Sequence, residues 1–135
     1  MPTNFLALDV GRARIGLALA NDIARIASPL PALTNDDNML VGLQALINEY
    51  SATTLVVGLP RGLSGQSTEQ TQYVENFIAD LAKQLDTKIV TQDEAVTSIQ
   101  AEAELKKRGK PYTKGDIDSL SAVYILEDFL TEGVH

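Results

Sequence analysis

The chain has 135 residues, of which 44% are hydrophobic and 21% are charged. This composition excludes an intrinsically disordered chain, and no apolar run approaches the roughly 20 residues that cross a bilayer. The sequence has no cysteine, which excludes disulfides and thiol chemistry, and its only histidine is His135. The first residues lack the pattern of a secretory signal, so we expect a single cytoplasmic domain over residues 1–135, with no membrane partner.

The net charge of −7 argues against a nucleic-acid partner, but the basic residues are unevenly distributed. Five of the eleven fall in one short window: Lys106, Lys107, Arg108, Lys110 and Lys114. Arg12, Arg14 and Arg61 lie in other expected loops or strand ends. The window is either a nucleic-acid contact or a solvated helix end, where cations interact favourably with the helix dipole.

The secondary structure follows from the spacing of apolar residues and from turn residues. Strands are predicted where apolar residues alternate or run together, over residues 4–9, 14–20, 24–28, 53–60 and 87–92. Helices are predicted where apolar residues recur three and four positions apart, from Asp36 or Asp37 to Tyr50, over 68–85, from Thr97 to Gly109, and from Asp116 to about Thr131.

Details of these boundaries are also predicted. The strand over 24–28 should end before Pro29, because proline interrupts strands. Thr97 with Gln100 is typical of a capping box, and Asp116 is expected to be the N-cap of the last helix. Leading strands followed by alternating helices and strands predict an α/β fold with a mixed sheet of about five strands and helices on both faces.

Three acidic residues occupy positions where a carboxylate is costly or where α/β proteins bind ligands. Asp9 ends the first apolar strand, and a buried carboxylate costs several kcal/mol unless a cation or hydrogen-bond donor meets it. Glu94, preceded by Asp93, follows a buried strand at the edge where open α/β sheets bind ligands. Asp118 heads an apolar stripe of the last helix that continues through Ala122, Ile125 and Phe129.

These positions predict that Asp9, Glu94 and Asp118 converge. Carboxylates that lie close together raise one another's pKa values, and a divalent cation with oxygen ligands removes this repulsion. Two such ions would activate a water molecule and stabilise the leaving oxygen in phosphodiester cleavage. Gly11 and Gly16 would let a phosphate backbone approach closely. The alternative for Asp93 or Glu94 is that it only places negative charge at a helix N-terminus.

Four segments together resemble the YqgF/RuvX family, pre-16S rRNA nucleases once described as Holliday junction resolvase-like. "LALDVGRARIGLALAND" is similar to its opening D-x-G-x-x-R-I-G signature, and "VVGLPRGLSGQS" to its V-G-L-P…G segment. "TQDEAVTSIQAEAEL" resembles its D-E-R-L-T-T…A element, and "DIDSLSAVYILEDFL" resembles its closing D-x-x-A-A…I-L-x-x-[FY]-L helix. The match covers essentially the whole chain in order.

The resemblance implies a ribonuclease H-like fold and a nuclease in which Asp9, Glu94 and Asp118 are the catalytic residues and metal ligands. We expect Asp9 to bridge two Mg²⁺ or Mn²⁺ ions and the other two acids to bind one ion each. The implied activity is trimming of the 5′ end of pre-16S rRNA in the cytoplasm, with ribosomal precursor particles as partners. We expect a monomer or weak homodimer. The expected substrate-binding residues are Gly11, Arg12, Arg14, Arg61, Lys107, Arg108 and Lys114.

The sequence departs from the family pattern at three places. Ala13 stands where the family usually has a basic residue, Ala95 replaces the arginine after the D-E pair, and Thr97–Ser98 replaces the T-T pair. Arginine binds phosphate in a bidentate manner, so its loss affects substrate contact more than metal binding. Arg12, displaced by one position, is the residue that would compensate.

Other functions fit parts of the sequence. ATPases of the actin/hexokinase type also have a D-x-G phosphate loop, but this chain is too short for the paired domains of that fold. A second alternative is a ribosome-assembly module that binds nucleic acid but has no catalytic activity. The absence of the family's basic residues at Ala13 and Ala95 favours it. A branched-DNA resolvase would use the same chemistry, as a two-fold dimer on a symmetric junction. Tyr73 and Phe77 are interpreted as core residues rather than a base-stacking platform, whereas Tyr112 either stacks on a base or lies in a flexible loop.

Overall fold

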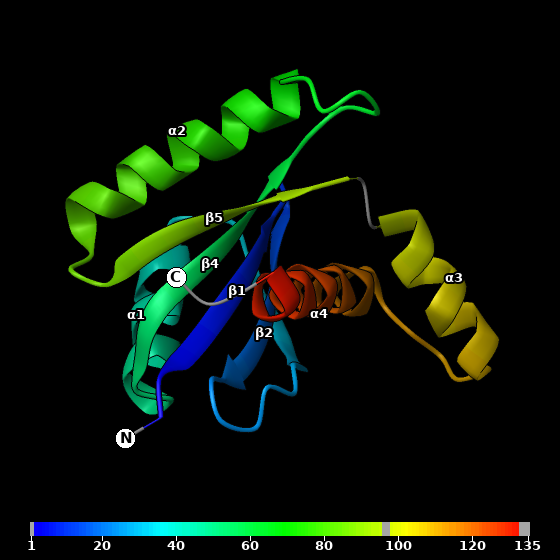
Figure 1. The fold of residues 1–135 in the computed structure, drawn as a ribbon, viewed down its shortest axis with the longest axis horizontal. Helices are drawn as coiled ribbons and strands as arrows, with labels where there is room; N and C mark the ends of the chain where they lie inside the picture. The colour runs from blue at the N-terminus through cyan, green and yellow to red at the C-terminus, as the bar shows by residue number, and fades with distance from the viewer. Residues whose placement is uncertain (1, 96–97, 133–135) are drawn as a thin grey trace.

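The structure is a computed structural model that describes residues 2–95 and 98–132. These residues form one mixed five-stranded sheet and four helices (Figure 1). The strands are β1 (Asn4–Val10), β2 (Arg14–Asn21), β3 (Ser28–Thr34), β4 (Ala52–Pro60) and β5 (Lys88–Glu94). The helices are α1 (Met39–Glu49), α2 (Glu69–Gln84), α3 (Ser98–Arg108) and α4 (Lys114–Glu132). The predicted α/β class is therefore confirmed.

The order of the strands brings the ends of three of them to one edge. The sheet runs β3-β2-β1-β4-β5, in which β1, β4 and β5 are parallel while β2 is antiparallel to both β1 and β3. Asp9 near the end of β1 is paired with Gly16 of β2, and Glu94 at the end of β5 is paired with Pro60 of β4. The carboxyl ends of parallel strands lie at the same edge, so Asp9 and Glu94 share it.

The two faces of the sheet carry separate hydrophobic cores. Phe5 and Ala7 of β1 pack against α4, whereas Leu6 and Leu8 pack on the side of α1 and α2. Successive side chains of a strand point to opposite faces, so Asp9 follows Phe5 and Ala7 onto the α4 face. Helices thus cover both faces, and α3 lies beside α4, away from the strands (Figure 1).

Helix α4 lies close to the sheet because glycine occupies the contact positions. A Cβ on Gly16 would lie 2.0 Å from the backbone oxygen of Asp118, and one on Gly58 would lie 2.3 Å from Cδ1 of Ile125. In addition, the Ser119 hydroxyl donates to the Leu30 oxygen (2.7 Å) and accepts from the Leu17 amide (3.3 Å). These contacts fix the first turns of α4, which carry Asp118, against β2.

The third strand differs from the prediction. The expected strand over 24–28 is wrong, because β3 begins at Ser28 and contains both Pro29 and Pro31. This strand is at the edge of the sheet and is hydrogen-bonded to β2 alone. An edge strand can place the prolines where no ladder donor is needed.

Two helix starts also differ. Helix α1 begins at Met39 after the N-cap Asn38, and Asp36 instead accepts a hydrogen bond from the Asn38 amide (2.9 Å). Helix α4 begins at Lys114, and Thr113 precedes it; Thr113 Oγ1 accepts from the Asp116 amide (3.1 Å) while Asp116 Oδ2 accepts from the Thr113 amide (2.8 Å). Asp116 therefore closes a capping box and is not the N-cap.

The other helix boundaries agree with the prediction to within about two residues. Helix α2 has Thr68 as its N-cap, and α3 ends at Arg108 before Gly109, whose φ of +74° is the left-handed conformation typical of a helix C-terminus. The predicted capping box of Thr97 with Gln100 involves Thr97, which lies outside the described residues, as does the tail with His135. Within the described part of the chain, no helix has the length and apolar character needed to span a membrane.

Candidate active site

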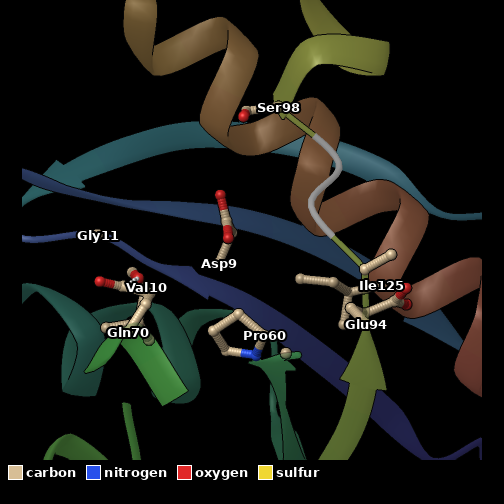
Figure 2. A pocket seen from close by; sticks show the side chains of 10 residues that line it. Asp9, Val10, Gly11, Pro60, Gln70, Glu94, Ser98 and Ile125 are labelled. Atoms are coloured by element: carbon tan, nitrogen blue, oxygen red, sulfur yellow. Dashed lines mark hydrogen bonds between the residues drawn. The ribbon is translucent and has the colours of Figure 1, made fainter. Parts of the chain in front are cut away.

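A cavity of about 220 Å³ lies at the edge of the sheet where β1, β4 and β5 end. Its walls come from the ends of these strands, from the N-terminal part of α2, from the start of α3 and from Ile125 in the middle of α4 (Figure 2). Two carboxylates contribute to it, Asp9 and Glu94. The remaining lining residues are small, apolar or neutral: Val10, Gly11, Gly58, Pro60, Gln70, Ala95, Ser98 and Ile125.

Asp9 has an unusual electrostatic environment. Its pKa is raised from 3.8 to about 7, mainly by burial and in addition by the nearby charge of Asp118. In Figure 2 its side chain projects toward Ser98. A carboxylate with such a raised pKa binds a proton or a cation readily at neutral pH.

Glu94 is the second acid of the cavity. Its pKa is raised from 4.5 to about 8, first by burial and then by a hydrogen bond with Asp128 and by the charges of Asp128 and Glu132. Its Oε1 atom is buried and has no hydrogen-bond partner among the described residues. Figure 2 shows its carboxyl group turned away from Asp9, beside Ile125. An unpartnered buried oxygen calls for a ligand, because such groups are normally satisfied.

Asp118 lies in an adjoining cavity of about 300 Å³. Its Oδ2 is 2.7 Å from Nε of Arg14, and the two side chains are 21% and 36% exposed. Ser98 lines both cavities, so the two are neighbours. The second cavity also contains Lys114. Asp118 is therefore near enough to raise the pKa of Asp9 but is held by a cation of its own.

The structure places the three predicted acids in one region, but their carboxyl groups do not converge on a single point. Within residues 2–95 and 98–132, no group of three or more Asp, Glu or His side chains is arranged to hold a metal ion. Asp9 and Glu94 line one cavity, and Asp118 lines the next.

The donors that are present nevertheless fit a hard divalent cation. All are carboxylate oxygens, and one of them is buried without a partner. Mg²⁺ is commonly held by one or two carboxylates together with water and substrate phosphates. A bound cation would lower the pKa values of both Asp9 and Glu94, because an opposite charge favours the ionised form.

The arginines predicted to bind substrate lie near the two cavities: Arg12 and Arg61 follow residues that line the first, and Arg14 lines the second. Gly11 lines the first cavity, Arg12 is next in the chain, and Arg14 begins β2. Arg61 follows β4, and its Nε is 3.4 Å from Oδ1 of Asp93. Its Nη1 donates to the Ser67 hydroxyl (2.8 Å), and its backbone amide donates to the backbone oxygen of Glu94 (2.8 Å). Asp93 alternates with Glu94 along β5 and is exposed, which explains why only Glu94 lines the cavity.

The basic residues of the window over 106–114 lie in different places in the structure. Lys114 lines the second cavity with Arg14 and Asp118. Lys107 and Arg108 end α3 and line neither of the two cavities; Arg108 instead lies 3.6 Å from Glu104 on its own helix. Tyr112 is tied down by a hydrogen bond from its hydroxyl to Glu102 (3.0 Å).

Several residues near the site were not found from the sequence. Ser98 lines both cavities, and Gln70 lines the first and donates to the Val10 oxygen (3.1 Å). Asn35 donates from its side chain to the Gly11 oxygen (2.8 Å). These are neutral polar residues of loops and helix starts, and only the fold shows what they contact.

Comparison with known proteins agrees with the sequence resemblance. The model of the RuvX family, described as a Holliday junction resolvase, matches residues 3–132. A relative from Sulfurihydrogenibium sp. (strain YO3AOP1), named "Putative pre-16S rRNA nuclease", is 37% identical over 130 residues, covering 95% of this chain and 90% of the relative. A protein of the same name from Shewanella denitrificans is 35% identical over 133 residues, covering 96% and 94%.

Solved structures show the same fold at low sequence identity. RuvC of T. thermophilus, in complex with a Holliday junction, aligns with a TM-score of 0.52 and 13% identity over 97% of this chain and 96% of that one. The resolvase of fowlpox virus, in complex with Holliday junction DNA, gives a TM-score of 0.54 and 11% identity over 95% and 99%. The shared architecture is the ribonuclease H-like fold, as predicted. The family match and the relatives together show that this chain belongs to the RuvX family.

Proposed function

We propose that this protein is a divalent-metal-dependent nuclease that hydrolyses phosphodiester bonds and processes the 5′ end of pre-16S rRNA in the cytoplasm, during ribosome biogenesis. The observation that carries the proposal is the cavity at the sheet edge, in which Asp9 and Glu94 both have strongly raised pKa values. Membership of the RuvX family, with relatives named as pre-16S rRNA nucleases, supports the choice of substrate.

Asp9, Glu94 and Asp118 are the residues that would hold Mg²⁺ or Mn²⁺. When bound, one or two such ions would supply Lewis-acid stabilisation and an activated water for the hydrolysis. The Asp9 side chain already points into the cavity. The carboxyl group of Glu94 is hydrogen-bonded to Asp128, and that of Asp118 is paired with Arg14. We infer that a substrate phosphate draws Arg14 away from Asp118, because a guanidinium binds phosphate through the same donors. With Arg14 bound to the substrate phosphate, the carboxylate of Asp118 would be available to bind a metal ion.

The cations around the cavities would hold the nucleic-acid backbone. Arg12 and Arg61 directly follow Gly11 and Pro60, which line the first cavity, and Arg14 and Lys114 line the second. Gly11 lines the first cavity, where a phosphate could approach its backbone. The net charge of −7 repels nucleic acid elsewhere on the surface, so binding should be local and should weaken steeply with salt.

A resolvase acting on branched DNA is the second candidate. The description of the family and the two solved neighbours, each in complex with a Holliday junction, favour it. A symmetric junction requires two active sites, so this function needs a two-fold dimer. The monomer or weak homodimer that we propose fits a single cut in RNA better.

Cleavage of two substrates side by side tests the proposal. The purified protein is given an RNA that contains the 5′ leader and start of 16S rRNA, or a four-way DNA junction, with Mn²⁺, Mg²⁺ or a chelator. Asp9→Asn, Glu94→Gln and Asp118→Asn should each lose metal-dependent cleavage of the RNA. Glu75→Gln, which changes an exposed acid of α2 outside both cavities, is the matched control.

Each outcome has a distinct meaning. Cleavage of the RNA that needs metal and disappears with Asp9→Asn supports the proposal. Cleavage of the junction alone assigns the protein to the resolvases. Salt-sensitive binding of RNA without cleavage would show an assembly factor, and cleavage that survives both Asp9→Asn and Asp118→Asn would overturn the catalytic assignment.

A further inference from the structure

The turn between β1 and β2 is fixed from two sides. The Asn35 side chain donates to the Gly11 oxygen (2.8 Å), and its amide donates to the Ala13 oxygen (2.9 Å). On the other side, Gln70 of α2 donates to the Val10 oxygen (3.1 Å). The turn that carries Arg12 is therefore anchored to the end of β3 and to α2, and its backbone has little freedom.

The side chain of Arg12 is also held, by an aromatic ring. Its Cζ lies 4.3 Å from the centroid of the Tyr73 ring, over the face. The hydroxyl of Tyr73 accepts a hydrogen bond from Nδ2 of Asn35 (3.1 Å). One amide group thus contacts both the turn and the ring, so Asn35 fixes the ring against the turn. A guanidinium over an aromatic face is attracted by the negative face of the ring.

Arg12 differs from Arg14 and Arg61, the other two arginines near the cavities. Arg14 lies 2.7 Å from Asp118 and Arg61 lies 3.4 Å from Asp93, so each has a carboxylate partner. Among the described residues, no carboxylate lies within 4.0 Å of Arg12. The ring of Tyr73 leaves the charge of Arg12 uncompensated and its edge N–H donors open. Those donors form the planar fork that matches a phosphate group.

The pair of Arg12 and Tyr73 lies beside the Asp9 cavity. Arg12 adjoins Gly11, and Tyr73 lies one helical turn beyond Gln70; both Gly11 and Gln70 line the Asp9 cavity. We propose that Tyr73, fixed by Asn35, is a positioning residue that holds Arg12 ready to bind a backbone phosphate beside the reacting bond. This inference rests on the proposed function. It gives Tyr73 a role in addition to the predicted core packing, since its ring also packs against the core on the α2 face.

A mutant cycle tests the inference by RNA binding and by kinetics. The variants are Tyr73→Leu, Tyr73→Phe, Arg12→Gln and the double variant Arg12→Gln/Tyr73→Leu. The affinity of each for the leader RNA is measured by fluorescence anisotropy with chelator present, so that no cleavage occurs, and kcat and KM are measured with Mn²⁺. Tyr50→Leu, at the C-terminus of α1, is the matched aromatic control.

Tyr73→Leu should weaken binding about two- to fivefold, which is what loss of a cation–π contact of this kind predicts. KM should rise by a similar factor while kcat stays the same. Tyr73→Phe keeps the ring and should restore most of the affinity. Arg12→Gln should weaken binding more and should lower the slope of log affinity against log salt by about 0.7–0.9, the value for one phosphate contact.

The double variant decides between positioning and simple structural support. If Tyr73 acts through Arg12, Tyr73→Leu has no further effect once Arg12 is glutamine. An equal loss in both backgrounds, or a fall in kcat at constant KM, would overturn the inference. If wild-type protein binds the RNA without cleaving it, the proposed function fails while the binding cycle still tests this inference. If it binds no nucleic acid, both are wrong.

Discussion

Nε of Arg14 lies 2.7 Å from Oδ2 of Asp118, across 104 residues of sequence. The acid that heads the inward stripe of α4 is thus neutralised by a cation from β2. An unpaired carboxylate on the inward side of α4 would destabilise the folded state, and the ion pair with Arg14 removes this cost.

Removing this cation should strengthen metal binding. Arg14→Gln leaves Asp118 without its partner, so we expect Mn²⁺ to bind about two- to fivefold more tightly, as measured by titration calorimetry. Arg61→Gln makes the same change in net charge beside Asp93, which does not line the cavity, and should have a smaller effect. The increase in Mn²⁺ affinity should disappear in the double variant Arg14→Gln/Asp118→Asn. Equal gains for Arg14→Gln and Arg61→Gln would show that only net charge matters.

The raised pKa of Asp9 predicts a stabilising substitution. Folding raises this pKa from 3.8 to about 7, so the folded state favours the protonated acid. The corresponding stability is complete below the unfolded pKa and is lost as the pH rises through the folded pKa. With chelator present, Asp9→Asn should therefore unfold at a higher temperature than wild type at about pH 8.5, and the difference should shrink toward about pH 5. Thermal unfolding at the two pH values checks this, and a difference that is constant with pH would contradict it.

Close packing of α4 on β2 predicts contrasting effects of alanine at two glycines. Gly16→Ala places a Cβ 2.0 Å from the Asp118 backbone oxygen, so α4 must shift. We expect a loss of about 1–3 kcal/mol in the free energy of unfolding, measured with urea. Gly115→Ala, in the first turn of α4, meets no atom closer than 3.4 Å and should be neutral or slightly stabilising. Similar losses for both variants would be inconsistent with the close approach.

The division of the basic window predicts which lysine contacts the nucleic acid. Lys114 lines the cavity that contains Arg14 and Asp118, whereas Lys107 lines neither cavity. Lys114→Gln should therefore weaken RNA binding and lower its salt dependence by about one phosphate contact. Lys107→Gln, an identical change of charge, should have the smaller effect. Anisotropy measured over a series of salt concentrations distinguishes the two.

Part of this site follows from sequence periodicity. Odd-numbered residues of β1 face α4, as do even-numbered residues of β5, so strand alternation places Asp9 and Glu94 on one face. The glycines at positions 16 and 58 allow α4 to lie close to that face. Three of the four segments that resemble the family lie at the ends of β1, β4 and β5, and the fourth lies in α4. Their resemblance to the family is what predicted the ribonuclease H-like fold.

The remaining features depend on contacts between distant segments. Burial and the neighbouring acids Asp128 and Glu132 of α4 raise the pKa of Glu94, and no local pattern indicates which acids will be neighbours. The expected strand over 24–28 was wrong because proline disfavours interior strands but is tolerated at an edge, and the position of a strand in the sheet is a property of the whole fold. The stacking of Arg12 on Tyr73 likewise joins a turn to a helix that is far away in sequence.

A crystal of the protein soaked in Mn²⁺ tests the central claim most directly, because anomalous scattering locates the metal without assuming its ligands. We predict a Mn²⁺ ion bound by carboxylate oxygens of Asp9 and Glu94, with Asp118 joining them when a phosphate-bearing oligonucleotide is present. Metal found only elsewhere, for example at the acidic surface of Asp36, Asp37 and Asp80, would contradict the proposed site.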